Sequence, residues 1–131
     1  MKKVLILFLG VTVFLTACGT ADEKVKGKWS YRYAESQNLS FFADKERMYV
    51  EAKGIQLDVI PLKDATSNKF NFLLDTKKQN YVYNVKIEDD EHIVITPEPE
   101  DKVSLPERLV GSDNINDDTK KVKSITLKKI D

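Results

Sequence analysis

The chain has 131 residues and a mass of 15.0 kDa, which fits a single domain. Its 21 basic and 21 acidic residues cancel, which argues against a dedicated nucleic-acid-binding protein, because such proteins carry a basic surplus. A single cysteine excludes an internal disulfide framework. Because the chain also has only one histidine, a His/Cys zinc site is not expected. The charged fraction of 32% is typical of a globular domain rather than a multi-span membrane protein.

The first residues carry the features of a secretory signal. Lys2 and Lys3 precede an apolar stretch of thirteen residues, from Val4 to Thr16, with Gly10 in its middle. A helix that crosses a bilayer needs about 20 apolar residues, so this stretch is too short to span. A positive start, a short apolar stretch and small residues after it predict a signal peptide.

The signal ends in Leu15-Thr16-Ala17-Cys18-Gly19, which resembles the lipobox of bacterial prolipoproteins. The resemblance implies that the thiol of Cys18 receives a diacylglyceryl group and that a signal peptidase cuts between Ala17 and Cys18. Two acyl chains are enough for stable anchoring. The expected location is therefore the cell membrane, on its extracellular side, or the outer membrane in a host that has two. The alternative is an ordinary secretory signal followed by a chance cysteine.

The predicted cleavage and lipidation divide the chain into three parts. Residues 1–17 are the signal peptide, 18–26 are the lipidated cysteine with a flexible tether, and 27–131 are a single β-barrel domain. Removal of 1–17 leaves 19 basic and 21 acidic residues. Because the mature chain is slightly negative, we expect no general attraction to anionic lipids, so the acyl chains hold the domain alone.

From Gly27 onward the hydrophobic pattern has a period of two, which is typical of strands. Trp29, Tyr31 and Tyr33 alternate with polar or small residues, and the later runs are likewise rich in β-branched and aromatic side chains. The pattern predicts strands at 27–34, 39–43, 47–52, 55–62, 69–75, 80–88, 92–97 and 122–130.

The links between most of these strands are short and polar, so neighbouring strands should be antiparallel, because parallel crossovers need a dozen residues or more. Eight such strands in chain order favour closure into a small all-β meander barrel, which removes exposed edges. An open or sandwiched sheet is the alternative.

The link before the last strand, 98–121, is longer and irregular. Ser104-Leu105-Pro106-Glu107 has the features of a helix start, with a serine cap and a proline in the first turn, and Gly111 ends the helical turn. The residues 112–121 read as a polar loop. We interpret the link as a surface excursion that packs Leu105 and Leu109 on the barrel; a functional loop is the alternative.

The first predicted strand begins Gly27-Lys28-Trp29 and is followed by seven more short strands, which resembles the lipocalin-like (calycin-type) barrels. The resemblance implies that Trp29 closes the floor of the barrel. If the barrel is hollow, Trp29, Tyr31 and Tyr83 are the candidates to line a pocket for a small amphiphilic ligand. The alternative is that these aromatic side chains pack the core.

Two other positions invite a chemical role. His92 follows an acidic turn, but no nucleophile stands near it in the sequence, so we expect an exposed residue at a strand start rather than part of a catalytic triad. The oxygen-rich run 113–118 lacks the glycine and glutamate positions of an EF-hand. We therefore predict no catalytic residue, no metal and no cofactor.

Together these features predict a membrane-anchored, non-enzymatic binding module. Its partners would be membrane lipid through the acylated Cys18 and either a small amphiphilic ligand or an envelope protein, with no nucleic acid. The alternative is an immunity or exclusion-type lipoprotein that binds a toxin, bacteriocin or phage component at the cell surface. An envelope enzyme is the third hypothesis, and it requires a pocket with convergent titratable groups.

Overall fold

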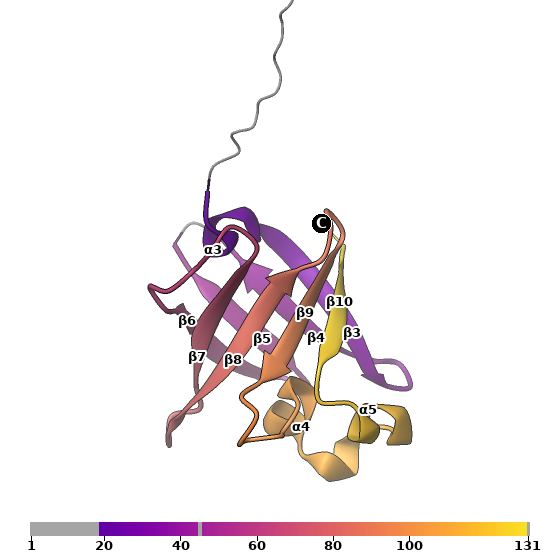
Figure 1. Ribbon diagram of the computed structural model, residues 1–131. Helices are drawn as coiled ribbons and strands as arrows, with labels where there is room; N and C mark the ends of the chain where they lie inside the picture. The colour runs from indigo at the N-terminus through magenta and orange to yellow at the C-terminus, as the bar shows by residue number, and fades with distance from the viewer. Residues whose placement is uncertain (1–18, 45, 131) are drawn as a thin grey trace, which may run out of the picture.

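The computed structural model describes residues 19–44 and 46–130, and within them eight strands form one closed barrel (Figure 1). Each strand is antiparallel to its neighbours in the chain, and the last strand closes the barrel on the first. This confirms the predicted all-β meander barrel. The strands are β3 (Gly27–Ala34), β4 (Gln37–Ala43), β5 (Met48–Ala52), β6 (Ile55–Pro61), β7 (Lys69–Asp75), β8 (Asn80–Ile87), β9 (His92–Pro97) and β10 (Ile125–Lys129).

The predicted signal peptide and Cys18 lie outside the described residues. The strands follow the period of two because alternate side chains point into the barrel and away from it. Trp29 lies opposite Phe41, and Phe41 lies opposite Val50; all three are buried. The adjacent residues in the same register, Lys28, Phe42 and Tyr49, form a row on the outer surface.

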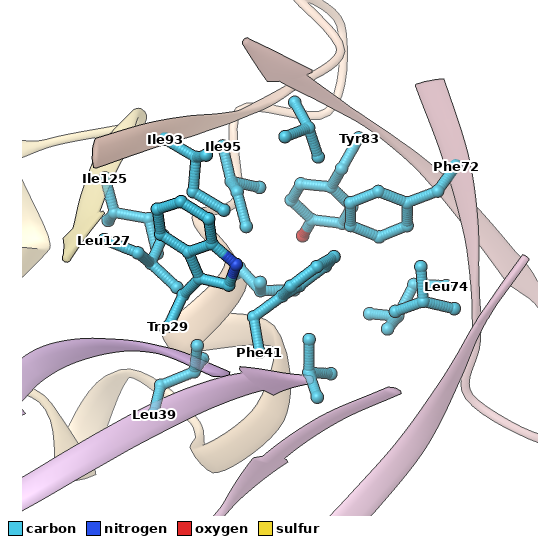
Figure 2. Close-up of a cluster of buried hydrophobic side chains, with 14 of the residues drawn as sticks. Trp29, Leu39, Phe41, Phe72, Leu74, Tyr83, Ile93, Ile95, Ile125 and Leu127 are labelled. Carbon is cyan, nitrogen blue, oxygen red and sulfur yellow. The ribbon is translucent and has the colours of Figure 1, made fainter. Parts of the chain in front are cut away.

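The inside of the barrel is filled by its own side chains. Figure 2 shows rings and aliphatic chains from opposite sides of the barrel meeting in its centre. Phe72 stacks on Tyr83 with 5.7 Å between ring centroids and 18° between planes, and Phe41 lies 6.1 Å from Phe72. An eight-stranded barrel has an interior that side chains alone can fill. The labelled side chains are at most 3% exposed: Trp29, Leu39, Phe41, Phe72, Leu74, Tyr83, Ile93, Ile95, Ile125 and Leu127.

One end of the barrel is covered by the single-turn helix α3 (Ala21–Lys24), which the sequence had suggested would be part of a flexible tether through residue 26. Ala21 and Val25 lie four residues apart, on the same face of the turn, and both are fully buried. The Ala21 amide donates to the Thr66 carbonyl at 2.8 Å. The chain is therefore fixed to the barrel from Ala21 onward.

The other end is covered by the connector between β9 and β10, which holds α4 (Leu105–Val110), the 3₁₀ turn η1 (Ser112–Asn114) and α5 (Asp117–Lys121) (Figure 1). The predicted helix start is confirmed, because the Ser104 hydroxyl accepts a hydrogen bond from the Glu107 amide. Leu105 and Leu109 are buried against the barrel as expected.

The second half of the connector differs from the predicted polar loop and strand start. Asn116 caps α5 by accepting the Thr119 amide at 2.7 Å, and the buried Thr119 hydroxyl donates to the Tyr33 carbonyl at 3.3 Å. Val122 is the C-cap of α5 and is 38% exposed, so its side chain does not point into the barrel. Strand β10 consequently begins at Ile125, three residues later than expected.

Candidate functional site: two grooves on the outer wall

The three aromatic side chains proposed from the sequence as ligand candidates lie in different surroundings. Trp29 is 3% exposed, and its indole N–H donates to the Val25 carbonyl at 3.4 Å, near α3. Tyr83 is fully buried and donates its hydroxyl proton to the Val103 carbonyl at 2.9 Å, near the connector. Tyr31 is half-buried, and its hydroxyl bonds to that of Thr119 at 3.1 Å. Each of them therefore packs the barrel or fastens a segment that covers one of its ends.

A polar cluster ties the connector to the barrel wall. The Arg108 guanidinium lies 3.5 Å above the Tyr81 ring, pairs with Asp101 and donates from Nε to the Tyr83 hydroxyl at 3.3 Å. Burial raises the pKa of Tyr83 to about 12, with Arg108 opposing the rise through its hydrogen bond and charge. The phenol is therefore neutral at physiological pH and acts as a hydrogen-bond bridge between β8 and the connector.

His92 is the first residue of β9, at the strand start predicted from the sequence, with its Nδ1 2.9 Å from an Asp89 carboxylate oxygen and its side chain 39% exposed. The Glu91 amide and the His92 ring lower the pKa of Asp89 through hydrogen bonds. Within residues 19–44 and 46–130, no group of three His, Cys, Asp or Glu side chains is placed to hold a metal ion. The geometry at His92 is that of a surface pair that stabilises the turn between β8 and β9.

Two grooves lie side by side on the outer wall at the α3 end, and they share Lys26, Asp44 and Arg47. The first, which we call the acidic groove, has a volume of about 450 Å³, and the second, the basic groove, about 470 Å³. Both exceed the volume of about 300 Å³ at which ligand sites begin. A third groove of about 270 Å³ lies between Lys24, Trp29 and Lys129.

The acidic groove runs between α3, the β4–β5 turn and β6. Among residues 19–44 and 46–130, five carboxylates line it against the two cations Lys26 and Arg47, so this lining carries a charge of about −3. Its apolar floor includes Ile60, which is 46% exposed. The carboxylates are those of Asp22, Glu23, Asp44, Glu46 and Asp58.

The basic groove lies on the outer face of β3, β4 and β5, where the strand register builds a row of stacked side chains. Phe42 and Tyr49 stack with 4.6 Å between centroids and 20° between planes. Lys28 Nζ is 5.0 Å from the Phe42 centroid, and the Arg47 guanidinium is 4.3 Å from that of Tyr49. Arg47 also pairs with Asp58 at 3.2 Å. With Lys26, three cations and one carboxylate, Asp44, line this groove among the described residues.

Sequence reasoning did not single out this row. A signal was present, because the alternation that points Phe41 inward points Phe42, a large aromatic residue, outward. Its neighbour depends on the register across the β4–β5 turn, which pairs Phe42 with Tyr49.

The fold places the chain in the class of small, closed, up-and-down antiparallel barrels. No family model matches the chain, and neither the curated proteins nor the solved structures gave a significant match. Among the residues that the structure describes, no helix has the length and apolar character needed to cross a bilayer.

Proposed function

We propose that the chain is a bacterial lipoprotein, anchored through diacylglyceryl-Cys18, whose barrel is a non-enzymatic binding module for an envelope partner. The support for the anchor is the lipobox Leu15–Gly19 with its basic and apolar leader. The barrel follows closely, since Ala21 is already bonded to the β6–β7 turn. The domain would thus work at the membrane surface.

The observation that carries the choice of partner is the contrast between the inside and the outside of the barrel. Inside, Phe41, Phe72 and Tyr83 are fully buried against one another, so an amphiphile could enter only by displacing them. Outside, two open grooves of ligand-binding size lie next to each other. A partner bound on the outer wall therefore fits better than a small molecule held within.

A second candidate is the immunity or exclusion-type role, which the acidic groove favours. Its carboxylates beside the exposed Ile60 complement a cationic, amphiphilic segment, a composition suited to a membrane-directed toxin or bacteriocin. A deletion strain should then become more sensitive to such an agent, and unchanged sensitivity to bacteriocins and phage would remove this role.

The anchor is tested by growth in radiolabelled palmitate. The wild-type protein should incorporate label and sediment with membranes, whereas Cys18→Ala should do neither. An unlabelled wild-type protein, or a Cys18→Ala protein that still sediments wholly with membranes, would overturn the anchor.

Partner binding is tested by photo-crosslinking in the native host, with a photoreactive residue in place of the exposed Ile60. A matched probe replaces Lys78, which is exposed at the opposite end. A discrete adduct is expected from position 60 and not from position 78. Equal adducts from both positions, or none from position 60, would contradict partner binding at the groove.

A further inference from the structure

We propose that the basic groove is a second membrane contact, which binds the phosphate groups of anionic phospholipids and tilts the anchored barrel onto its β3–β4–β5 wall. The inference rests on the proposed anchor at Cys18. Its structural basis is the row of Lys28, Phe42, Tyr49 and Arg47, with Lys26 beside it.

The anchor point and the groove are close together. Three peptide steps separate Cys18 from Ala21, and an extended chain of that length reaches at most about 11 Å. Ala21 is held by its hydrogen bond to Thr66 and by its burial in the core. The distance from Cys18 to the barrel is therefore limited to these three peptide steps. The α3 end of the barrel must therefore stay within roughly one Debye length, about 8–10 Å, of the headgroups.

The groove has the chemistry of the membrane interface. Aromatic rings gather at headgroup level, and lysine or arginine near the surface is attracted to anionic lipids. Lys26 and Arg47 are exposed, and Lys28 is half-buried over the Phe42 ring. Lys28 lies over the Phe42 ring and Arg47 over the Tyr49 ring of the stacked pair. A phosphate can therefore approach these cations while the aromatic rings contact the glycerol region.

The other charges at this end make the contact one-sided. Within the part of the chain that the structure describes, the acidic groove has five carboxylates against two cations, and the turn 88–91 adds four exposed acidic residues across the barrel, beside Lys24 and Lys129. An anionic surface attracts the basic groove and repels these two regions, so the barrel leans rather than standing upright. The acidic groove, which lies beside the basic groove, is then at the edge of the lipid contact, where a partner can reach it.

Net charge alone misses this contact, because the mature chain has two more acidic than basic residues. An anchored domain samples the surface at high effective concentration, so a weak local patch is enough to set its orientation. The same patch on a free domain would bind vesicles poorly.

The test couples the chain 18–131 to vesicles through Cys18, its only cysteine, with a maleimide lipid. All helices and strands that the structure describes lie between residues 21 and 129, so this chain retains the whole fold. Hydrogen exchange is measured on vesicles with phosphatidylglycerol and on vesicles of phosphatidylcholine alone. We expect exchange at residues 42–49 to slow about fivefold on the anionic vesicles and to recover in high salt.

Matched charge reversals decide which groups make the contact. Lys26→Glu with Lys28→Glu should abolish the slowing, whereas Lys77→Glu with Lys78→Glu, at the opposite end, should leave it intact. The neutral pair Lys26→Gln with Lys28→Gln repeats the first arm if the reversal impairs folding. Equal exchange on both vesicle types, slowing that survives both groove variants, or slowing at residues 77–79 would overturn the proposal.

Because coupling through maleimide needs no cellular lipidation, this result is independent of the palmitate experiment. A chain that takes up palmitate but shows no slowing at residues 42–49 would keep its anchor and lose the tilt. If slowing instead appears only when envelope protein is added, the groove is a protein-binding surface and the lipid contact is refuted.

Discussion

The two ends of the barrel are closed in different ways. At the α3 end a single helical turn buries Ala21 and Val25, and a few hydrogen bonds, such as that from the Ala21 amide to the Thr66 carbonyl, hold it. At the connector end, capped helices and the Arg108 cluster hold a segment of more than twenty residues in place. The end with the simpler closure bears the grooves described above, and it is the end nearest the proposed anchor.

The two ends also differ in how their polar side chains are used. At the connector end the polar side chains of Asp101, Arg108 and Thr119 bond to other groups of the fold. The α3 end leaves charged and aromatic side chains on the surface, around grooves that are large enough for a ligand. Binding is therefore expected at the α3 end, and substitutions at the connector end should act on stability.

The largest expected loss of stability comes from Leu105→Ala in α4. Leu105 is 1% exposed, and removal of a buried leucine costs about 2–5 kcal/mol. Val25→Ala at the α3 end removes about two methylene equivalents and should cost roughly 2 kcal/mol. Urea unfolding of both variants measures the difference. A Leu105→Ala protein as stable as the wild type would show that the connector is not part of the core.

Arg108→Ala should cost about 1–3 kcal/mol, since it leaves the partly buried Asp101 without its cation and removes the contact with Tyr81. A double-mutant cycle with Asp101→Asn isolates the pair, and a coupling energy of about 1 kcal/mol is expected. Additive effects of the two substitutions would contradict a latch between β8 and the connector. Partner crosslinking from position 60 should persist in the folded variants.

Asn116→Ala removes the cap of α5 and should lower the free energy of unfolding by about 1 kcal/mol. Asn116→Asp is the matched control, because its carboxylate accepts the same Thr119 amide. Chemical denaturation of the three proteins ranks them. If Asn116→Asp loses as much stability as Asn116→Ala, the cap is not what orders this part of the connector.

A pH-dependent effect is expected in alkali. Burial raises the pKa of Tyr83 to about 12 in the folded protein, above its ordinary value of 10. Between pH 10 and 12 the unfolded chain releases this proton and the folded chain keeps it, so stability contributed by the buried phenol is lost as pH rises. Absorbance of phenolate at 295 nm should show a late tyrosine titration that Tyr83→Phe removes, in addition to that of Tyr33, whose pKa burial also raises. A single titration near pH 10 for all tyrosines would refute the burial.

The strands were predictable from the sequence because a barrel wall has one wet and one dry face. That sidedness imposes the period of two on residues such as Trp29, Tyr31 and Tyr33, and the short turns then fix antiparallel order. Helix α4 was predictable from Ser104, Pro106 and Gly111, since each acts within a few residues of itself.

The missing features depend on distant contacts. Helix α3 had a local signal, the capping box of Thr20 and Glu23, but it is held by the burial of Ala21 and Val25 at the end of the barrel, which depends on the fold. Helix α5 had a local signal, Asn116 before two acidic and then two basic residues, that was obscured by the polarity of the segment. The outer row of Phe42 and Tyr49 requires the register of β4 with β5, which composition does not contain.

The central claim, a barrel held at the membrane by an acylated cysteine, is tested most directly by the amino-terminal peptide of the protein isolated from host membranes. Mass spectrometry should find a peptide that begins at residue 18 and carries the mass of a diacylglyceryl group on its sulfur. A peptide that begins at another residue, or one that begins at Cys18 with a free thiol, would contradict the account.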